Sequence, residues 1–116
     1  MINQNDLRIG NYVNYHDDDI VFQVTEISKL GIGVKNDTEE TWIEHDRFSP
    51  IKLTTEILDK INWGGYIKFN IGSYFKIDDV GHLYYRSDYS GVNIDYLHQL
   101  QNFYYLLRGI ELEIVW

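Results

Sequence analysis

Residues 95–109, Asp-Tyr-Leu-His-Gln-Leu-Gln-Asn-Phe-Tyr-Tyr-Leu-Leu-Arg-Gly, predict the clearest helix of the chain. Asp95 is typical of a helix N-cap, and Gly109 is typical of the residue that follows the last turn. At about 100° per residue, the apolar positions gather on one broad face: Leu97, Leu100, Phe103, Tyr104 and Leu107. The polar positions gather on the opposite face: His98, Gln101, Asn102 and Tyr105. The apolar face predicts packing against a sheet, and the polar face is either solvated or in contact with a partner.

An antiparallel sheet is expected under this helix. Strands are predicted at 66–71, 74–77 and 82–86, and turns at 78–81 and 87–91. The first of these strands points Ile67, Phe69 and Ile71 to one side, as in a sheet that is covered on one face.

Shorter elements flank this sheet. Thr54 or Thr55 is expected to cap a short helix over 55–61 that stops at Gly64-Gly65. Residues 110–116 alternate cleanly after Gly109 and predict a final strand, packed through Ile110, Leu112 and Ile114.

The N-terminal half is expected to contain only strands. Short β-branched or alternating segments at 7–15, 20–27, 31–35 and 41–43 are separated by polar turns, and 46–50 reads as a closing turn. Four short strands over about fifty residues predict a small curled sheet of the SH3-like kind. The chain is therefore expected to be α+β, with an SH3-like subdomain over 1–50 and an α/β subdomain over 51–116, packed as one unit.

Composition narrows the classes of function. The 116 residues include no cysteine, which removes disulfides, thiolate zinc sites and thiol nucleophiles. The N-terminal residues lack the apolar stretch of a signal peptide, and no apolar run approaches the roughly 20 residues of a membrane span, so a cytoplasmic location is expected. The formal net charge of −8 repels phosphate backbones and disfavours direct contact with nucleic acid. The same charge suits a basic protein surface, although it also serves solubility alone.

The sequence carries no recognisable catalytic motif. His16 with Asp17, Asp18 and Asp19 resembles an oxygen-rich metal site, but the spacing departs from a calcium loop and favours a solvated turn. The carboxylate pairs 39–40 and 78–79 also fall in predicted turns, where polar residues are expected without any function. We therefore expect a protein that is not an enzyme and that needs no cofactor.

Tyrosine is the one compositional excess, with eight of the ten tyrosines in the second half of the chain. Tyrosine is enriched in protein interfaces, but half-buried sheets also select it. Stacking of single-stranded RNA bases on these tyrosines is a third interpretation. The shortage of basic residues around the tyrosines argues against it. The candidate partner-binding residues lie in the predicted strand at 82–86, the turn at 87–91, the polar helix face and the acidic turn: Tyr84, Tyr85, Tyr89, His98, Gln101, Asn102, Tyr105, Asp17, Asp18 and Asp19.

Three segments resemble a family of small proteins from Bacteroidota bacteria and their phages and prophages. These are Leu-Arg-Ile-Gly-Asn-Tyr-Val at 7–13, Pro-Ile-Lys-Leu-Thr at 50–54, and the helix at 96–104 with Gly109 and Glu111-Leu112. The family brings no established catalytic residues. The resemblance implies a phage-borne protein that acts in the host cytoplasm by binding a host protein, and it includes the possibility of an anti-CRISPR inhibitor of a type VI RNA-guided nuclease.

The expected function is thus non-catalytic binding to a host protein. Two alternatives stay open. One is an assembly module of phage or housekeeping type that forms a homo-oligomer through its aromatic residues, and the other is a small metal-dependent enzyme that uses residues 16–19.

Overall fold

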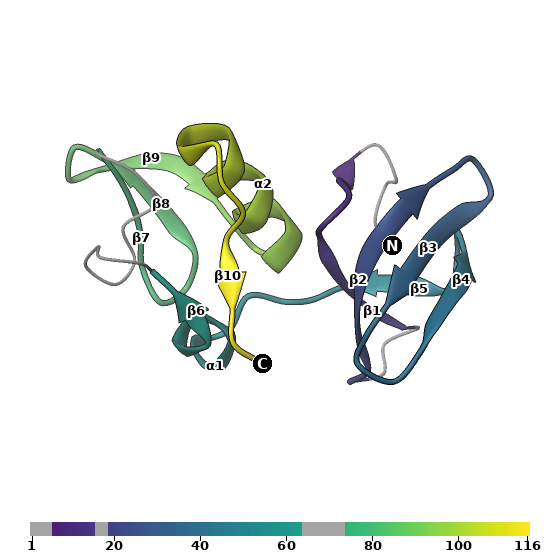
Figure 1. Ribbon diagram of the computed structural model, residues 1–116. Coiled ribbons are helices and arrows are strands. Elements are labelled where there is room, and N and C mark those ends of the chain that lie inside the picture. Colours follow the sequence, from purple (N-terminus) through teal and green to yellow (C-terminus); the bar gives the residue numbers. More distant parts are fainter. Residues whose placement is uncertain (1–5, 16–18, 64–73) are drawn as a thin grey trace. The chain divides into compact units, whose positions relative to one another are not determined.

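The computed structural model describes residues 6–15, 19–63 and 74–116. Within these ranges the chain forms two helices and three antiparallel sheets, which confirms the α+β class (Figure 1). Its contacts divide the chain into two compact units, unit 1 (Met1–Ile51) and unit 2 (Lys52–Trp116). The division lies next to the boundary that the sequence suggests at Pro50.

Unit 1 is a five-stranded antiparallel sheet. Its strands are β1 (Tyr12–Tyr15), β2 (Val21–Ile27), β3 (Gly31–Lys35), β4 (Glu40–Glu44) and β5 (Phe48–Pro50). The strand order is β4-β3-β2-β1-β5, so four strands follow one another as a meander and the fifth returns to pair with the first. This is the arrangement expected of a curled SH3-like sheet, and Figure 1 shows that the sheet of unit 1 is strongly curled.

Two predicted boundaries in unit 1 are wrong. The first strand begins at Tyr12 and not at Leu7, because Gly10 adopts a φ of 102° and turns the chain before the ladder starts. The segment 46–50 does not end in a turn, because Phe48 to Pro50 pairs with β1. Phe48 is buried, so its side chain favours the strand, and a proline is tolerated on the outermost strand of a sheet.

The core of unit 1 is aliphatic and aromatic. Its buried members are Leu7, Val13, Phe22, Val24, Ile32, Val34, Ile43 and Phe48. The register of β2 against β3 shifts between Val24 and Glu26. Such a bulge bends a strand and increases its twist, which helps a short sheet to curl.

Gly31 keeps β3 and β4 close together. A Cβ atom at Gly31 would collide with the backbone carbonyl oxygen of Ile43, and a backbone atom cannot rotate away as a side chain can. We expect Gly31→Ala to destabilise unit 1 by about 1–3 kcal/mol, because overpacking of this size forces the two strands apart. Faster amide hydrogen exchange in β3 and β4 is the measurement.

The matched control is the neighbouring Leu30→Ala. Leu30 is 79% exposed, so its truncation should change stability by less than about 0.5 kcal/mol. Equal protection of β3 and β4 in Gly31→Ala and Leu30→Ala would contradict the close-packing argument.

The described residues of unit 2 form both helices and five short strands. The elements are α1 (Thr55–Asp59), β6 (Ile61–Asn62), β7 (Phe75–Ile77), β8 (His82–Tyr85), β9 (Asp88–Asn93), α2 (Leu97–Arg108) and β10 (Glu113–Ile114). Strands β7, β8 and β9 form an antiparallel sheet in that order, and β6 pairs with β10. The strand predicted at 66–71 lies outside the described residues.

Helix α1 is shorter than predicted. Thr54 is its N-cap, with the Thr54 side-chain oxygen accepting a hydrogen bond from the backbone N–H of Ile57 at 3.2 Å. The helix ends at Asp59 and not at Ile61, because Ile61 pairs with Ile114 in the β6–β10 ladder. Ile61 and Ile114 are both buried, so the strand pairing hides two side chains that a longer helix would not bring together.

Helix α2 begins at Leu97, and Asp95 is not its N-cap. The Gln99 side chain instead accepts hydrogen bonds from the backbone N–H groups of Asp95 and Tyr96, each at 3.1 Å. The predicted C-terminus is confirmed, because Gly109 adopts a φ of 70° and its N–H donates to the carbonyl of Tyr105. Figure 1 shows α2 beside the β7-β8-β9 sheet, and Phe103 contacts Phe75 of β7 edge-on at 5.3 Å between ring centroids.

The buried stripe of α2 is rotated from the predicted one. Leu97, Leu100 and Tyr104 are buried as expected, but His98 and Gln101 are also buried, at 4% and 1% exposed. Leu107 is 37% exposed, and Ile110 beyond the helix is 55% exposed, so neither belongs to the core. Apolar periodicity missed this rotation because it assigns every amide and imidazole to the outside.

The segment 87–91 is not a turn, as predicted, but most of strand β9. The turn consists of Arg86 and Ser87, whose φ angles of 51° and 74° lie in the left-handed region. Two positive φ angles in a two-residue loop match the right-handed twist of the flanking strands. The Arg86 guanidinium lies 4.7 Å from the Tyr74 ring centroid, and the Arg86 N–H donates to the Tyr74 carbonyl at 2.9 Å. These contacts hold the turn without glycine or asparagine.

Ser87 is a site where a glycine should stabilise unit 2. A left-handed backbone costs a non-glycine residue about 1–2 kcal/mol, and glycine loses about 0.5–1 kcal/mol through greater chain entropy. We therefore expect Ser87→Gly to raise the free energy of unfolding by about 0.5–1 kcal/mol in denaturant titrations.

Ser87→Ala is the control, because it removes the hydroxyl and keeps the Cβ atom that causes the strain. Its stability should stay within about 0.5 kcal/mol of the parent. A Ser87→Gly protein less stable than Ser87→Ala would show that the left-handed strain argument is wrong.

Candidate functional site

The β8–β9 hairpin brings two of the predicted contact residues together. Tyr84 and Tyr89 are register partners, and their ring centroids lie 5.8 Å apart. His82 is register partner to Asn93, and its ring lies 5.2 Å from that of Tyr89. We call His82, Tyr84, Tyr89 and Asn93, with Asp78 at their edge, the outer face of the sheet.

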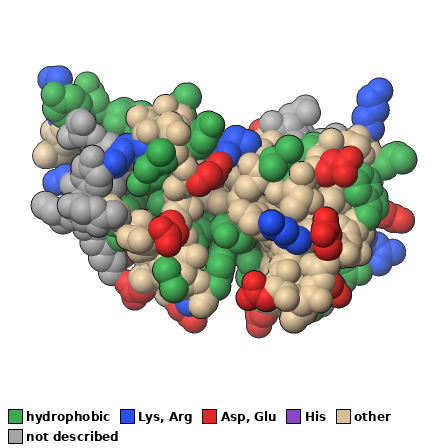
Figure 2. Space-filling view, in the orientation of Figure 1, with side chains coloured by type: hydrophobic (Ala, Val, Ile, Leu, Met, Phe, Trp, Pro, Cys, Tyr) green, Lys and Arg blue, Asp and Glu red, His purple; other side chains and the backbone are tan. Residues whose placement is uncertain are grey.

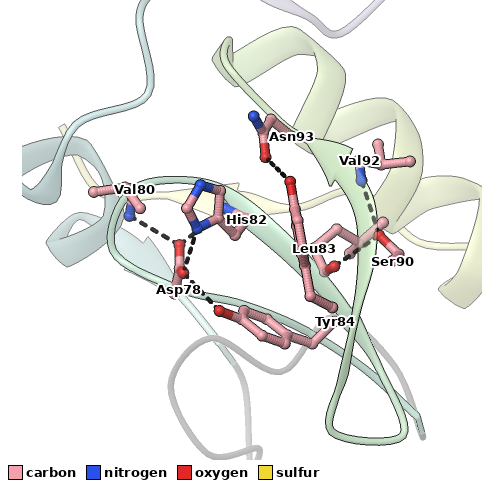
Figure 3. Close-up of polar contacts among 9 residues, drawn as sticks. Asp78, Val80, His82, Leu83, Tyr84, Ser90, Val92 and Asn93 are labelled. Atoms are coloured by element: carbon pink, nitrogen blue, oxygen red, sulfur yellow. Dashed lines mark hydrogen bonds and ion pairs between the residues drawn. The ribbon is translucent and has the colours of Figure 1, made fainter.

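Asp78 organises one end of the outer face (Figure 3). Its Oδ1 accepts hydrogen bonds from the backbone N–H groups of Val80 and His82, at 3.1 and 2.8 Å. Its Oδ2 accepts a hydrogen bond from the Tyr84 hydroxyl at 3.1 Å and lies 3.1 Å from Nδ1 of His82. One carboxylate thus fixes a turn, an imidazole and a phenol at once.

Gly81 makes this turn possible. Its φ of 87° is a conformation that glycine adopts without a steric penalty. A Cβ atom at Gly81 would also collide with the carbonyl oxygen of Ile94, and the Ile94 N–H donates to the Gly81 carbonyl at 2.7 Å. The loop before β8 is therefore tied to the chain that leaves β9.

The contacts around Asp78 shift two pKa values. Burial acts to raise the pKa of Asp78, but the hydrogen bonds from His82, Val80 and Tyr84 outweigh it and hold this pKa below its ordinary value of 3.8. The hydrogen bond to Asp78 raises the pKa of Tyr84 above 10.0, and desolvation and the Asp78 charge act in the same direction. At neutral pH, Asp78 is ionised and Tyr84 is a neutral donor.

A second set of bonds fixes the other end of the outer face. The Tyr89 hydroxyl donates to Oδ1 of Asn93 at 2.7 Å. The Ser90 hydroxyl donates to the Leu83 carbonyl at 2.7 Å and accepts from the Val92 N–H at 3.2 Å, which bridges the irregular part of β9 (Figure 3). The Tyr89 side chain is 51% exposed, so its ring is held in place while it still faces solvent.

The pair of Asp78 and His82 has the geometry of an acid-base dyad, since a carboxylate that contacts one imidazole nitrogen orients the other. The hydroxyl of Ser90 is engaged with the backbone of Leu83, and Tyr84 is a hydrogen-bond donor to Asp78.

The structure separates the other predicted contact residues from the outer face. Tyr85 alternates to the opposite side of β8, where its ring lies 5.0 Å from that of Phe75. His98 and Gln101 are buried, so they are not exposed contact residues as expected. Asn102 is partly buried and Tyr105 is 42% exposed on α2.

The predicted acidic turn belongs to unit 1. Asp19 is exposed before β2, and Asp17 and Asp18 lie outside the described residues, as does His16. Among the residues that the structure describes, no three His, Asp or Glu side chains form a group that could hold a metal ion.

Sequence reasoning missed Asp78, His82 and Asn93 as members of the site. Asp78 was considered only as half of a carboxylate pair, and His82 only as the first residue of the strand predicted at 82–86. The available signal was an Asp followed four residues later by His with Gly81 between them, since Asp in such a position caps its own turn. The partnership of Tyr89 with Asn93 had no such signal, because it depends on the irregular register of β9.

No protein-family model matches the chain, and comparisons with curated proteins and with solved structures gave no significant match. Among the described residues, no helix has the length and apolar character that crossing a membrane requires.

The lowered pKa of Asp78 makes a directional prediction about stability. A carboxyl with a depressed folded-state pKa stabilises the fold fully above its unfolded pKa, and this contribution is lost as the pH falls through the folded value. We expect Asp78→Asn to cost about 1–2 kcal/mol near neutral pH, because the charge-assisted hydrogen bonds are lost. Its deficit relative to the parent should shrink below pH 3.8 in denaturant titrations.

Asp79→Asn is the control for that experiment, because Asp79 is the exposed neighbour of Asp78. Its effect should stay below about 0.5 kcal/mol. In Asp78→Asn, the pKa of Tyr84, measured from its ring signals in NMR titrations, should also fall toward the ordinary tyrosine value. A stability deficit that grows as the pH falls would contradict the assigned role of the ionised carboxylate.

Proposed function

We propose that this chain is a non-catalytic binding protein that recognises a protein partner through the outer face of the β7-β8-β9 sheet. The observation that carries the proposal is the pair of tyrosine rings at Tyr84 and Tyr89, each held by its own side-chain acceptor. Tyr84 donates to Asp78, and Tyr89 donates to Asn93.

Fixed aromatic side chains are suited to binding because association otherwise costs about 0.5–1.5 kcal/mol for each side chain that must be immobilised. The hydrogen bonds of the outer face already order these side chains in the folded protein, so less side-chain entropy is lost on binding. The rings then offer large contact area with a polar group attached, which is the property that enriches tyrosine in interfaces. His82 adds a polar group beside them, with 41% of its side chain exposed.

The proposed partner is a host protein that handles nucleic acid, and specifically a type VI CRISPR RNA-guided nuclease in the cytoplasm of a bacterial host. Support for this narrower form comes from the net charge of −8, which attracts a basic nucleic-acid groove, and from the resemblance to phage-borne proteins. The protein then acts as a phage-encoded inhibitor that occupies a surface of the nuclease. No direct contact with nucleic acid is required.

The test is capture of partners by the tagged protein from a lysate of a Bacteroidota host that carries a type VI CRISPR system, with and without RNase. We expect one stoichiometric nuclease that survives RNase, and weaker capture at high salt, since charge attraction between exposed groups is screened. Tyr89→Ser should reduce capture about ten-fold, because an exposed central tyrosine is a typical interface hot spot.

Tyr105→Ser is the comparison variant, since Tyr105 is a similarly exposed tyrosine on α2, at 42% against 51% for Tyr89. It should leave capture unchanged. If Tyr105→Ser abolishes capture and Tyr89→Ser does not, the helix and not the outer face binds the partner. RNase-sensitive capture would instead indicate binding through nucleic acid.

Self-assembly is the second candidate function, and strand β9 is the observation that favours it. All six residues of β9 are exposed, and β9 pairs with β8 on one side only among the described strands. An unpaired strand edge can accept a strand from a second copy. Light scattering that shows a stable dimer would favour an assembly module over a host-protein binder.

A further inference from the structure

One ring nitrogen of His82 on the outer face is open to a bound molecule. Nδ1 lies 3.1 Å from Oδ2 of Asp78 (Figure 3). Nε2 has no hydrogen-bond partner among the described residues, and 41% of the His82 side chain is exposed. Nε2 is therefore the atom that the imidazole offers to a partner.

The contacts of Asp78 decide which nitrogen of His82 carries the proton. Asp78 is ionised at neutral pH, so its oxygens accept hydrogen bonds and cannot donate them. Oδ2 therefore receives a hydrogen from Nδ1 of His82, as it does from the Tyr84 hydroxyl. A neutral imidazole has only one N–H group. The neutral ring is thus the Nδ1–H tautomer, and its Nε2 is a hydrogen-bond acceptor.

The rings beside His82 suit a cation. The centroid of the Tyr89 ring lies 5.2 Å from that of His82 and 5.8 Å from that of Tyr84. Each tyrosine hydroxyl donates to an acceptor of this chain, so both rings are held in place. Aromatic ring faces attract guanidinium and ammonium groups. A fixed acceptor beside fixed rings is therefore complementary to a cationic donor.

The charged groups around the His82 ring favour the same sign of ligand. Asp78 contacts the ring, and Asp79 follows in the same turn with an exposed side chain. Lys76 of β7 lies on the outer face by its register, and β9 contributes the phenol of Tyr89. Two carboxylates thus outweigh one ammonium. The whole chain adds a net charge of −8, and Figure 2 shows acidic side chains at the surface of both units.

We propose that Nε2 of His82 accepts a hydrogen bond from an arginine guanidinium of the protein partner, and that Asp78 is the positioning residue that holds the proton on Nδ1. The guanidinium lies against the Tyr89 ring, because a planar cation can stack on an aromatic face while its edge donates. Arginine is a common anchor in protein interfaces. This inference rests on the proposed function and names the group by which the partner is recognised.

Protonation of His82 reverses this recognition. In the imidazolium both nitrogens are donors, so Nε2 no longer accepts, and the positive ring repels the guanidinium. Histidine side chains change charge between about pH 5 and 8. The pKa of Asp78 lies below 3.8 and that of Tyr84 above 10.0, so neither group changes protonation in this range. Binding of a guanidinium is therefore expected to weaken as the pH falls.

The first measurement is the tautomer of His82 in the full chain, from long-range proton–nitrogen NMR correlations at about pH 8, where an ordinary imidazole is neutral. We expect Nδ1–H in the parent and Nε2–H in Asp78→Asn. In this variant the amide oxygen stays on the backbone N–H groups of Val80 and His82, because an NH₂ group cannot accept from them. The NH₂ group then faces Nδ1 and drives the proton to Nε2.

Asp79→Asn is the control for the tautomer, because it changes the exposed neighbour of Asp78. It should keep the tautomer of the parent. An Nε2–H tautomer in the parent would overturn the inference, and so would an unchanged Nδ1–H tautomer in a folded Asp78→Asn protein.

The second measurement is a titration of the full chain with acetyl-arginine amide, followed by NMR. The ring signals of His82 and Tyr89 should shift, and those of Tyr105, a similarly exposed tyrosine on α2, should not. Acetyl-citrulline amide has nearly the same shape without the charge and should bind about ten-fold more weakly. Affinity for the arginine probe should fall about ten-fold from about pH 8 to about pH 5, as the acceptor is lost.

His82→Asn separates recognition from structure and keeps the test decisive if Asp78→Asn fails to fold. The shorter side chain retains an N–H donor for Asp78 and has no atom in place of Nε2. This variant should fold and bind the arginine probe about ten-fold more weakly than the parent.

Three outcomes of the titration would overturn the inference: no shift at His82 and Tyr89, equal binding of the arginine and citrulline probes, or stronger binding at the lower pH. Failure of the proposed function looks different, because the arginine probe would bind as described while no protein is captured from the host lysate. Capture that depends on Tyr89 but is unchanged in His82→Asn would keep the proposed function and reject this inference.

Discussion

The carboxylate of Asp78 is the contact on which the candidate binding face depends. It satisfies two backbone N–H groups of its own turn and also engages the side chains of His82 and Tyr84. Because the carboxylate is ionised, these bonds are charge-assisted and stronger than bonds between neutral groups. Folding of one tight turn therefore sets the orientation of an imidazole and a phenol on the neighbouring strand.

The two units of the chain differ in the chemistry that they expose. Unit 1 carries most of the acidic excess and a hollow lined by Trp42 and Tyr15, while unit 2 presents tyrosines that are fixed by hydrogen bonds.

Several elements could be predicted because the local signal and the tertiary structure agree. Strand β3 spans Gly31–Lys35, the range predicted from its sequence, and Gly109 ends α2 as a left-handed residue. The wrong predictions fall where contacts with other segments of the chain, and not the local sequence, determine the structure. Strand β9 was missed because Arg86 and Ser87, which lack the glycine or asparagine of typical hairpin turns, form its turn through contacts with Tyr74.

The amino-acid sequence by itself determined the α+β class, the order of the main elements and the acidic, tyrosine-rich character of the chain. These properties depend on composition and on periodicity over a few neighbouring residues. Only the tertiary structure decided that Tyr84 shares a face with Tyr89, and that Gln101 is buried. Strand register and helix rotation depend on packing between segments far apart in the sequence, and a residue pattern within one segment carries no record of its partner.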